Sequence, residues 1–149
     1  MVTLARDQKG VPMKVGDLMT SEVATLQRNE MLSLAEQLMS LGRIRHLPVV
    51  DEEGELVGIV SQRDLFHSGL LRALGHGKHS AARVREMLAV KEVMTTDVIT
   101  TTRDASLEEA ARLMFDKKIG CLPVVENGRL VGILTEGDFV AYFAGRKKR

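Results

Sequence analysis

An internal duplication is the feature that most constrains what this chain can fold into. Three segments recur in the same order, the first two at an offset of 75 residues and the third after a one-residue deletion. Repetition over this length indicates one supersecondary unit used twice, and such units bury their apolar faces against each other. We therefore expect two similar units that pack together. The recurring pairs are Val15–Val23 with Val90–Val98, Ile44–Val50 with Ile119–Val125, and Gly54–Asp64 with Gly128–Asp138.

Each copy opens with a short segment rich in β-branched residues, at 23–26 and at 98–101, which predicts a strand. A helix follows. In the second copy Ser106 and Glu109 have the spacing of a capping box, in which each satisfies a free backbone N–H group. The first copy has Met31 at the position of Ser106, so its helix begins from Asn29 or without a side-chain cap. Apolar residues at helical spacing predict a core face in both helices: Leu32, Ala35, Leu38, Met39, and Leu107, Ala110, Leu113, Met114.

Two apolar runs come next in each copy, 47–50 and 56–60 in the first and 122–125 and 130–134 in the second. Asn127-Gly128 between such runs predicts a hairpin, because both residues adopt positive φ readily. A second helix is expected to start near Gln62 and near Glu136. The order β-α-β-β-α in each copy indicates the α/β class.

The duplication predicts the domain boundaries. We expect a mobile N-terminal segment over 1–12, a first unit over 13–66, a connector over 67–89, a second unit over 90–144 and a basic tail over 145–149. The connector is expected to continue a helix, break at a Gly-rich stretch and end in a short helix after Ser80.

Composition excludes several classes of protein. Aromatic residues are 3% of the chain, too few for base-stacking surfaces that hold single-stranded nucleic acid. The single Cys121 excludes an internal disulfide framework and is expected to be buried. The net charge is +1, and four of the 21 basic residues are the run 146–149, so the remainder carries −3 and lacks the basic face of a duplex-DNA binder. No apolar stretch approaches the roughly 20 residues of a membrane span, and the first residues do not resemble a secretory signal, so a cytoplasmic location is expected.

The repeated pattern Gly-x-x-Ser/Thr-x-x-Asp carries the functional signal. It gives Ser61 with Asp64 and Thr135 with Asp138, each pair at a strand-to-helix junction. Free N–H groups there favour an anion, and a carboxylate can accept bonds from the two hydroxyls of a ribose. Gly58 and Gly132 would let a flat ligand approach the backbone. The alternative is that the hydroxyl residues are helix caps and the aspartates are first-turn acids. The spacing leaves both interpretations open.

The Met-Thr opening, the Leu-Pro-Val-Val run and the Leu-Val-Gly-Ile-x-Ser/Thr-x-x-Asp ending resemble the cystathionine-β-synthase-type (CBS) domain. The tandem over 15–144 resembles a Bateman module. The resemblance implies two β-α-β-β-α units forming one pseudo-two-fold module, a homodimer, and a cleft between units that binds AMP, ADP, ATP or S-adenosylmethionine as a regulatory ligand. It implies ribose binding by Ser61, Asp64, Thr135 and Asp138. It also implies a base pocket of backbone and apolar groups: Val23, Ala24, Thr25, Ile44, Leu47, Pro48, Val98, Ile99, Thr100, Ile119, Cys121, Leu122 and Pro123.

The two copies differ where a phosphate is expected. The cationic candidates are Arg43, Arg45, His46 and Arg63 in the first copy and Lys118 in the second. Because Arg binds phosphate bidentately, we expect two unequal sites, or one occupied and one vestigial. Family members often carry Pro after the first strand, where this chain has Arg28 and Arg103.

No nucleophile with an adjacent base is recognisable, and we expect no enzyme activity and no required cofactor. The histidines at 67, 76 and 79 lack carboxylate or thiolate neighbours, so no metal site is expected. The sequence favours a stand-alone regulatory module that transmits ligand binding through a dimer to an unidentified protein. The alternatives are a protein-interaction scaffold without ligand and weak nucleic-acid binding by the basic tail.

Overall fold

The computed structural model describes residues 6–7, 9–68 and 85–146. The Gly-rich part of the expected connector, Ser80 and the last three residues of the basic tail lie outside this range, as do residues 1–5 and 8. The chain forms two compact units. The continuous unit comprises Ala24–Val98, and the discontinuous unit comprises Met1–Val23 together with Ile99–Arg149.

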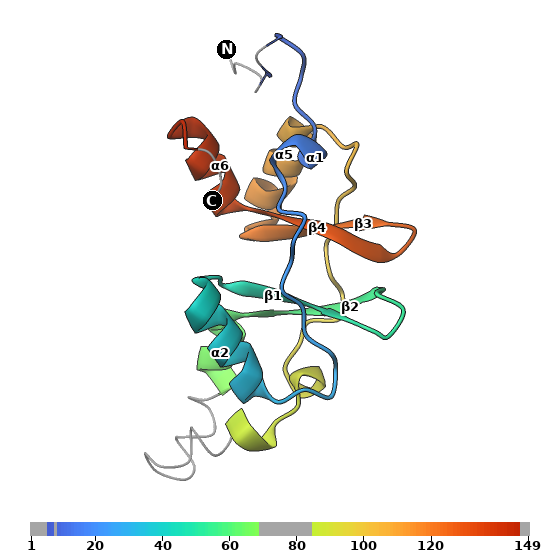
Figure 1. The fold of residues 1–149 in the computed structure, drawn as a ribbon, viewed down its shortest axis with the longest axis vertical. Coiled ribbons are helices and arrows are strands. Elements are labelled where there is room, and N and C mark those ends of the chain that lie inside the picture. Colours follow the sequence, from blue (N-terminus) through green and yellow to red (C-terminus); the bar gives the residue numbers. More distant parts are fainter. Residues whose placement is uncertain (1–5, 8, 69–84, 147–149) are drawn as a thin grey trace. The chain divides into compact units, whose positions relative to one another are not determined.

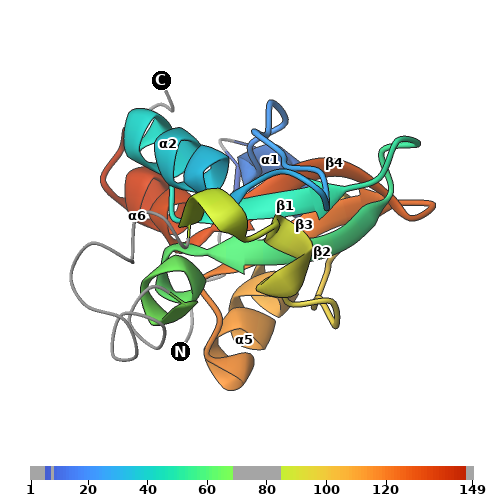
Figure 2. The same cartoon turned by 90° about the horizontal axis from the view of Figure 1, so that it is seen from below.

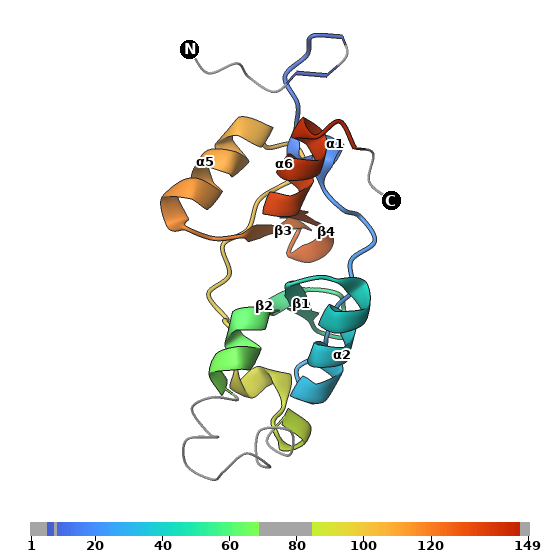
Figure 3. The same ribbon diagram turned by 90° about the vertical axis from the view of Figure 1, so that its left-hand side faces the viewer.

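The continuous unit is built around an antiparallel hairpin of β1 (His46–Val50) and β2 (Leu56–Ser61). Helix α2 (Leu32–Gly42) and a second helix over 62–68 cover one face of this hairpin, as Figures 1 and 3 show. Figure 2 shows β1 and β2 side by side, with the short 3₁₀ helix η1 (Val90–Glu92) in the same unit. Two extended segments flank the hairpin. Leu26 forms a parallel bridge with Val49, and Thr95 forms an antiparallel bridge with Ile59.

The discontinuous unit repeats this plan. Its hairpin consists of β3 (Cys121–Glu126) and β4 (Arg129–Thr135), and α5 (Leu107–Lys117) and α6 (Glu136–Phe143) lie together over one face (Figure 3). Thr101 forms a parallel bridge with Val124. The second segment that flanks this hairpin comes from the N-terminal part of the chain. Thr20 forms an antiparallel bridge with Ile133 through two backbone hydrogen bonds of 2.8 and 2.9 Å.

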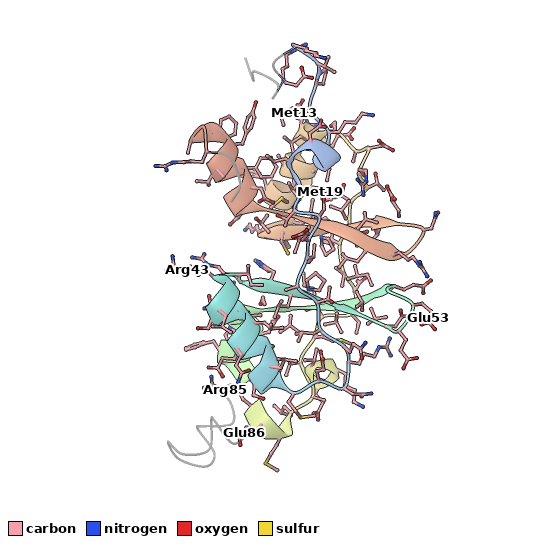
Figure 4. The ribbon with its side chains drawn as sticks, in the orientation of Figure 1. Met13, Met19, Arg43, Glu53, Arg85 and Glu86 are labelled. Atoms are coloured by element: carbon pink, nitrogen blue, oxygen red, sulfur yellow. The ribbon has the colours of Figure 1, made fainter. Side chains whose placement is uncertain are left out.

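The opening segment of each sequence copy therefore packs on the hairpin of the other copy. Residues 13–20, which contain α1 (Val15–Leu18), contribute Met13, Val15 and Met19 to the core of the discontinuous unit. Figure 4 marks Met13 and Met19 along this segment. The equivalent residues Leu88 and Val90 belong to the core of the continuous unit. The boundaries of the compact units therefore differ from those of the sequence repeats, 13–66 and 90–144, because each unit contains the opening segment of the other repeat.

The helix faces expected from sequence are confirmed as core. Leu32, Ala35 and Met39 lie in one buried cluster, with Leu38 packed against it. Leu107, Ala110 and Met114 lie in the other cluster, with Leu113 packed against it. Strand Leu and Val side chains at 0% exposure complete these cores: Leu47, Val49 and Val60 in the first, and Leu122, Val124 and Leu134 in the second.

Local features of the prediction also hold. Asn127 and Gly128 have φ of 50° and 79°, as a two-residue hairpin turn between Glu126 and Arg129 requires. The Ser106 hydroxyl accepts a bond of 3.0 Å from the N–H of Glu109. Met31 is the N-cap of α2 and makes no side-chain cap bond. The N–H of Leu32 instead donates to the carbonyl of Leu88 at 2.9 Å.

The α/β class and the repeated helix and strand pattern are confirmed, but the opening strands are not. Over 23–26 and 98–101 only Leu26 and Thr101 pair, each in a single parallel bridge. Their β-branched residues form extended backbone, and each segment bonds to its neighbouring strand at one position before the chain turns toward the helix. Leu26 donates its N–H to Pro48 O at 3.0 Å and accepts the Val50 N–H at 2.9 Å. Thr101 likewise donates to Pro123 O and accepts the Val125 N–H, both at 3.0 Å.

Candidate functional site

The first candidate site is the turn at which β2 ends and the helix over 62–68 begins. Ser61 is the last residue of β2, and Asp64 lies in the first helical turn. Asp64 Oδ2 accepts the Ser61 N–H at 2.7 Å and the Ser61 hydroxyl at 2.8 Å, and the Ser61 Oγ accepts the Asp64 N–H at 3.1 Å. These three bonds fix the carboxylate beside the hydroxyl at a helix N-terminus, where the backbone favours negative charge.

The second candidate site is the turn between β4 and α6. Thr135 is the N-cap of α6, and its N–H donates to Asp138 Oδ2 at 2.9 Å. Asp138 is 5% exposed and is the single polar residue of the buried set within the part of the chain that the structure describes. The capping interpretation is therefore confirmed for Ser61, whose hydroxyl accepts the Asp64 N–H. At Thr135, which is the N-cap residue of α6, the cap bond is the one from its own N–H to the Asp138 carboxylate. Ribose binding by the same residues stays a prediction.

Strand register decides which residue faces each hydroxyl. His46 is the cross-strand partner of Ser61, and Cys121 is the cross-strand partner of Thr135. Directly opposed residues have side chains on one face of the hairpin, about 5 Å apart at Cβ. His46 and Cys121 therefore hold equivalent positions beside the two motifs.

A backbone bond joins each turn to the residue that precedes the first strand of its hairpin. The Gln62 N–H donates to the Arg45 carbonyl at 2.8 Å, and the Glu136 N–H donates to the Gly120 carbonyl at 3.1 Å. These bonds place the backbones of Arg45 and Gln62 together in one unit, and those of Gly120 and Glu136 together in the other. Glu136 was not singled out as a site residue from the sequence, although its place directly after Thr135 was a usable signal.

The glycines of the motif serve the protein's own packing, which corrects the expectation that they admit a ligand. A Cβ on Gly58 would lie 3.0 Å from the carbonyl oxygen of Thr95 and 2.7 Å from the sulfur of Met94. A Cβ on Gly132 would lie 3.0 Å from the Thr20 oxygen and 2.6 Å from the sulfur of Met19. The opening segment of the opposite copy already occupies the space above each glycine.

The predicted base-pocket residues differ widely in exposure. Leu47 and Leu122 are 0% exposed members of the two cores, so neither offers accessible surface to a ligand in this structure. Three others are exposed, namely Ala24, Thr25 and Ile99. The predicted base-pocket residues are divided between the two units. The continuous unit contains Ser61 and Asp64 with Ala24, Thr25, Ile44, Leu47, Pro48 and Val98. The discontinuous unit contains Thr135 and Asp138 with Val23, Ile99, Thr100, Ile119, Cys121, Leu122 and Pro123.

Most of the cationic candidates belong to the continuous unit. Arg43, Arg45 and Arg63 are exposed, and His46 is half-buried. Arg43 ends α2 with φ of 51°, and Lys118 ends α5 with φ of 55°, so each copy has a basic residue in the left-handed region where Gly is usual. Figure 4 marks Arg43 at this end of α2.

Cys121 is 6% exposed, as expected. Burial, and after it the negative charge of Glu136, raise the pKa of the Cys121 thiol to about 12. The thiol therefore stays protonated at neutral pH and is a poor nucleophile. No group of three or more His, Cys, Asp or Glu side chains suited to a metal ion occurs among the residues that the structure covers.

The family model described as "CBS domain" matches residues 15–70 and 90–145, which together exceed half of the chain. The chain belongs to the CBS domain family. The matched ranges contain both hairpins and both Ser/Thr-x-x-Asp turns of the CBS pair. None of the described helices is long and apolar enough to cross a membrane.

Solved structures of CBS proteins resemble the whole pair. The AcuB protein of Vibrio cholerae is 41% identical, with a TM-score of 0.78 over 91% of this chain and 93% of that one. The CBS domain pair of protein MJ0100, in complex with 5′-methylthioadenosine and S-adenosyl-L-methionine, is 31% identical, with a TM-score of 0.72 over 91% and 99%. CBSX2 in complex with AMP is 30% identical, with a TM-score of 0.73 over 89% and 96%.

Curated relatives differ in how much of their length the CBS pair fills. The chain spans 81% of the CBS domain-containing protein YhcV of Bacillus subtilis, at 36% identity. It spans only 33% of protein MJ1404 of Methanocaldococcus jannaschii, also at 36% identity. The enzymes among these relatives, such as the homoserine O-acetyltransferase of Methanohalophilus mahii, are matched over 23–25% of their length.

Proposed function

We propose that this CBS pair is a regulatory module that binds an adenosine-containing ligand, AMP, ADP, ATP or S-adenosylmethionine, at the turns of Ser61 with Asp64 and Thr135 with Asp138. The carboxylates accept the ribose hydroxyls. Backbone and apolar groups near the first strands, such as Ile44 and Ile119, contact the base. The module acts by binding and not by catalysis.

The observation that carries the proposal is the likeness, over nearly the whole chain, to CBS proteins crystallised with AMP and with S-adenosylmethionine and 5′-methylthioadenosine. Local geometry supports it. In each turn one carboxylate oxygen, Asp64 Oδ2 or Asp138 Oδ2, accepts backbone or hydroxyl hydrogen atoms of the turn itself. A carboxylate has about four acceptor sites, so the Asp64 carboxylate keeps capacity for a diol.

A thermal-shift panel tests the proposal with AMP, ADP, ATP, S-adenosylmethionine and 5′-methylthioadenosine. A ligand at 100 times its dissociation constant should stabilise the folded chain by about 2.7 kcal/mol. Melting temperatures that do not change with any of these compounds would contradict the proposal.

Variants separate ligand binding from helix capping. Asp64→Asn and Asp138→Asn keep an amide oxygen for the capping bond but lose the charge that the ribose diol would face. The double variant should lose the ligand-induced shift. Asp17→Asn is the matched control, because Asp17 Oδ2 accepts the Lys14 N–H at 2.8 Å in the same cap geometry at the start of α1. This control should keep the full ligand response.

We also propose that a homodimer transmits the ligand signal to a downstream protein. Large apolar side chains stay exposed on the helices of both units: Leu41, Phe66, Phe115, Val140 and Phe143. Such residues are favoured at subunit interfaces. Light scattering of the purified chain checks the dimer, and Phe115→Lys together with Phe143→Lys should shift it toward the monomer.

A further inference from the structure

The two candidate turns share one backbone geometry but carry different charges. In both, the first residue of the helix donates its N–H to the residue before the hairpin, and a cross-strand residue faces the Ser or Thr. The differences therefore come from side chains at equivalent positions. The substitutions from the continuous to the discontinuous unit are Arg45 to Gly120, His46 to Cys121, Gln62 to Glu136 and Arg63 to Gly137.

The turn of Ser61 and Asp64 is cationic. Arg63 lies in the same first helical turn as Asp64, and the backbone of Arg45 is bonded to that of Gln62. Arg43 precedes Arg45 by two residues, and His46 is the cross-strand partner of Ser61. All three arginines are exposed, and none of them takes part in an ion pair within the described ranges. Guanidinium groups free of carboxylate partners can bind a phosphate bidentately.

The turn of Thr135 and Asp138 is anionic. Glu136 and Asp138 both lie in the first turn of α6, and in this copy the positions of Arg45 and Arg63 hold glycine. Lys118, at the C-terminal end of α5, is the one cationic candidate of this copy. The charge of Glu136 reaches the cross-strand partner of Thr135, because it contributes to the raised pKa of the Cys121 thiol. A phosphate at this turn would meet the same negative field.

A ribose diol and the 5′ substituent of the same nucleoside lie well within the Debye length of about 8 Å at physiological salt, so charges at one end of the sugar act on the other. We propose that the two turns select ligands of different charge. The turn of Ser61 and Asp64 takes an adenosine ligand that carries a 5′-phosphate, and the turn of Thr135 and Asp138 takes one that carries none. This selectivity rests on the proposed function and adds a ligand class for each site.

Calorimetric titration of single-site variants tests the selectivity, with AMP and 5′-methylthioadenosine as the two probes. In Asp138→Asn only the Ser61 turn keeps its carboxylate, and AMP should bind about tenfold more tightly than 5′-methylthioadenosine. In Asp64→Asn the order should reverse by a similar factor. Raising the salt concentration should weaken AMP binding in Asp138→Asn, while 5′-methylthioadenosine binding in Asp64→Asn stays nearly constant.

A charge variant tests the physical cause. In the Asp64→Asn background, Glu136→Gln should raise the affinity for AMP relative to 5′-methylthioadenosine about threefold or more. Glu109→Gln makes the same charge change on an exposed residue of α5 in the same unit and should leave the ratio unchanged.

The outcomes are distinguishable. Tighter binding of AMP in Asp138→Asn, together with tighter binding of 5′-methylthioadenosine in Asp64→Asn, supports the selectivity. The same preference in both variants, or a Glu136→Gln ratio equal to the Glu109→Gln ratio, overturns the selectivity and leaves the proposed function standing. Failure of every adenosine compound to bind the unsubstituted chain overturns both.

Discussion

Val15 and Val90 occupy equivalent positions in the two sequence copies, both are 0% exposed, and they lie in different cores. Val15 packs in the discontinuous unit with the hairpin β3–β4, and Val90 packs in the continuous unit with the hairpin β1–β2. Truncation of either to alanine should therefore loosen the hairpin of the other sequence copy.

The size of the effect follows from burial. Val→Ala removes two methyl groups, worth about 0.8 kcal/mol each in transfer free energy, and the cavity that remains brings the loss to about 2 kcal/mol. Since 1.4 kcal/mol is a factor of ten, local opening of the affected unit should become roughly 30-fold more frequent.

Hydrogen exchange followed by mass spectrometry measures this effect peptide by peptide. With Val15→Ala, the amides of Arg129–Thr135 should exchange faster, while those of Leu56–Ser61 change little. With Val90→Ala, the pattern should invert. Faster exchange of Leu56–Ser61 in Val15→Ala, or equal acceleration of both hairpins, would refute the assignment of the opening segments to opposite units.

Four further substitutions probe local features. Ser106→Ala removes the cap bond to Glu109 and should lower the free energy of unfolding by about 1 kcal/mol, whereas Met31→Ser supplies a missing cap and should raise it by about 0.5 kcal/mol in urea titrations. Gly132→Ala should lower the melting temperature, because its Cβ would lie 3.0 Å from a backbone oxygen. Because the folded-state pKa of Cys121 is raised to about 12, the protonated thiol favours folding below pH 9, and this contribution is lost as pH rises from 9 to 12; Cys121→Ala should flatten that part of a stability-against-pH curve.

The substitutions at Gly132 and Cys121 have matched comparisons. Gly54 has φ of 81° and open space at its Cβ position, so Gly54→Ala reports backbone strain without the clash expected at Gly132. Glu136→Gln removes the secondary cause of the raised Cys121 pKa and should make the alkaline loss of stability smaller, with the curve levelling off at slightly lower pH. A stability curve unchanged by Cys121→Ala would contradict the attribution to the thiol.

Local sequence signals predicted most of each unit. The core faces of α2 and α5, the Ser106 cap and the Asn127-Gly128 turn all depend on residues close in the chain, and all are present. The caps at Ser61 and Thr135 were likewise readable as one of two interpretations.

The destination of the opening segments could not be predicted from the same signals. Val15 and Met19 have equivalents at Val90 and Met94, and Gly58 has an equivalent at Gly132, so both hairpins offer the same acceptor to both segments. A duplicated sequence makes the two pairings locally equivalent. The choice between the two pairings depends on how the whole chain is connected, and no short stretch of the sequence contains that information. For the same reason the role of the two glycines was missed.

The pairing of Thr20 with Ile133 has a consequence for the order of events during synthesis. Its partners are separated by 113 residues, from 20 to 133, whereas Ile59 and Thr95 of the continuous unit are separated by only 36. As the chain leaves the ribosome, residues 24–98 can complete their own core before β4 has been synthesised. During this interval residues 13–20 have no hairpin to pack against. Contacts of long sequence separation form slowly. Until β4 emerges, this segment holds Met13, Val15 and Met19 without the hairpin that buries them in the folded unit.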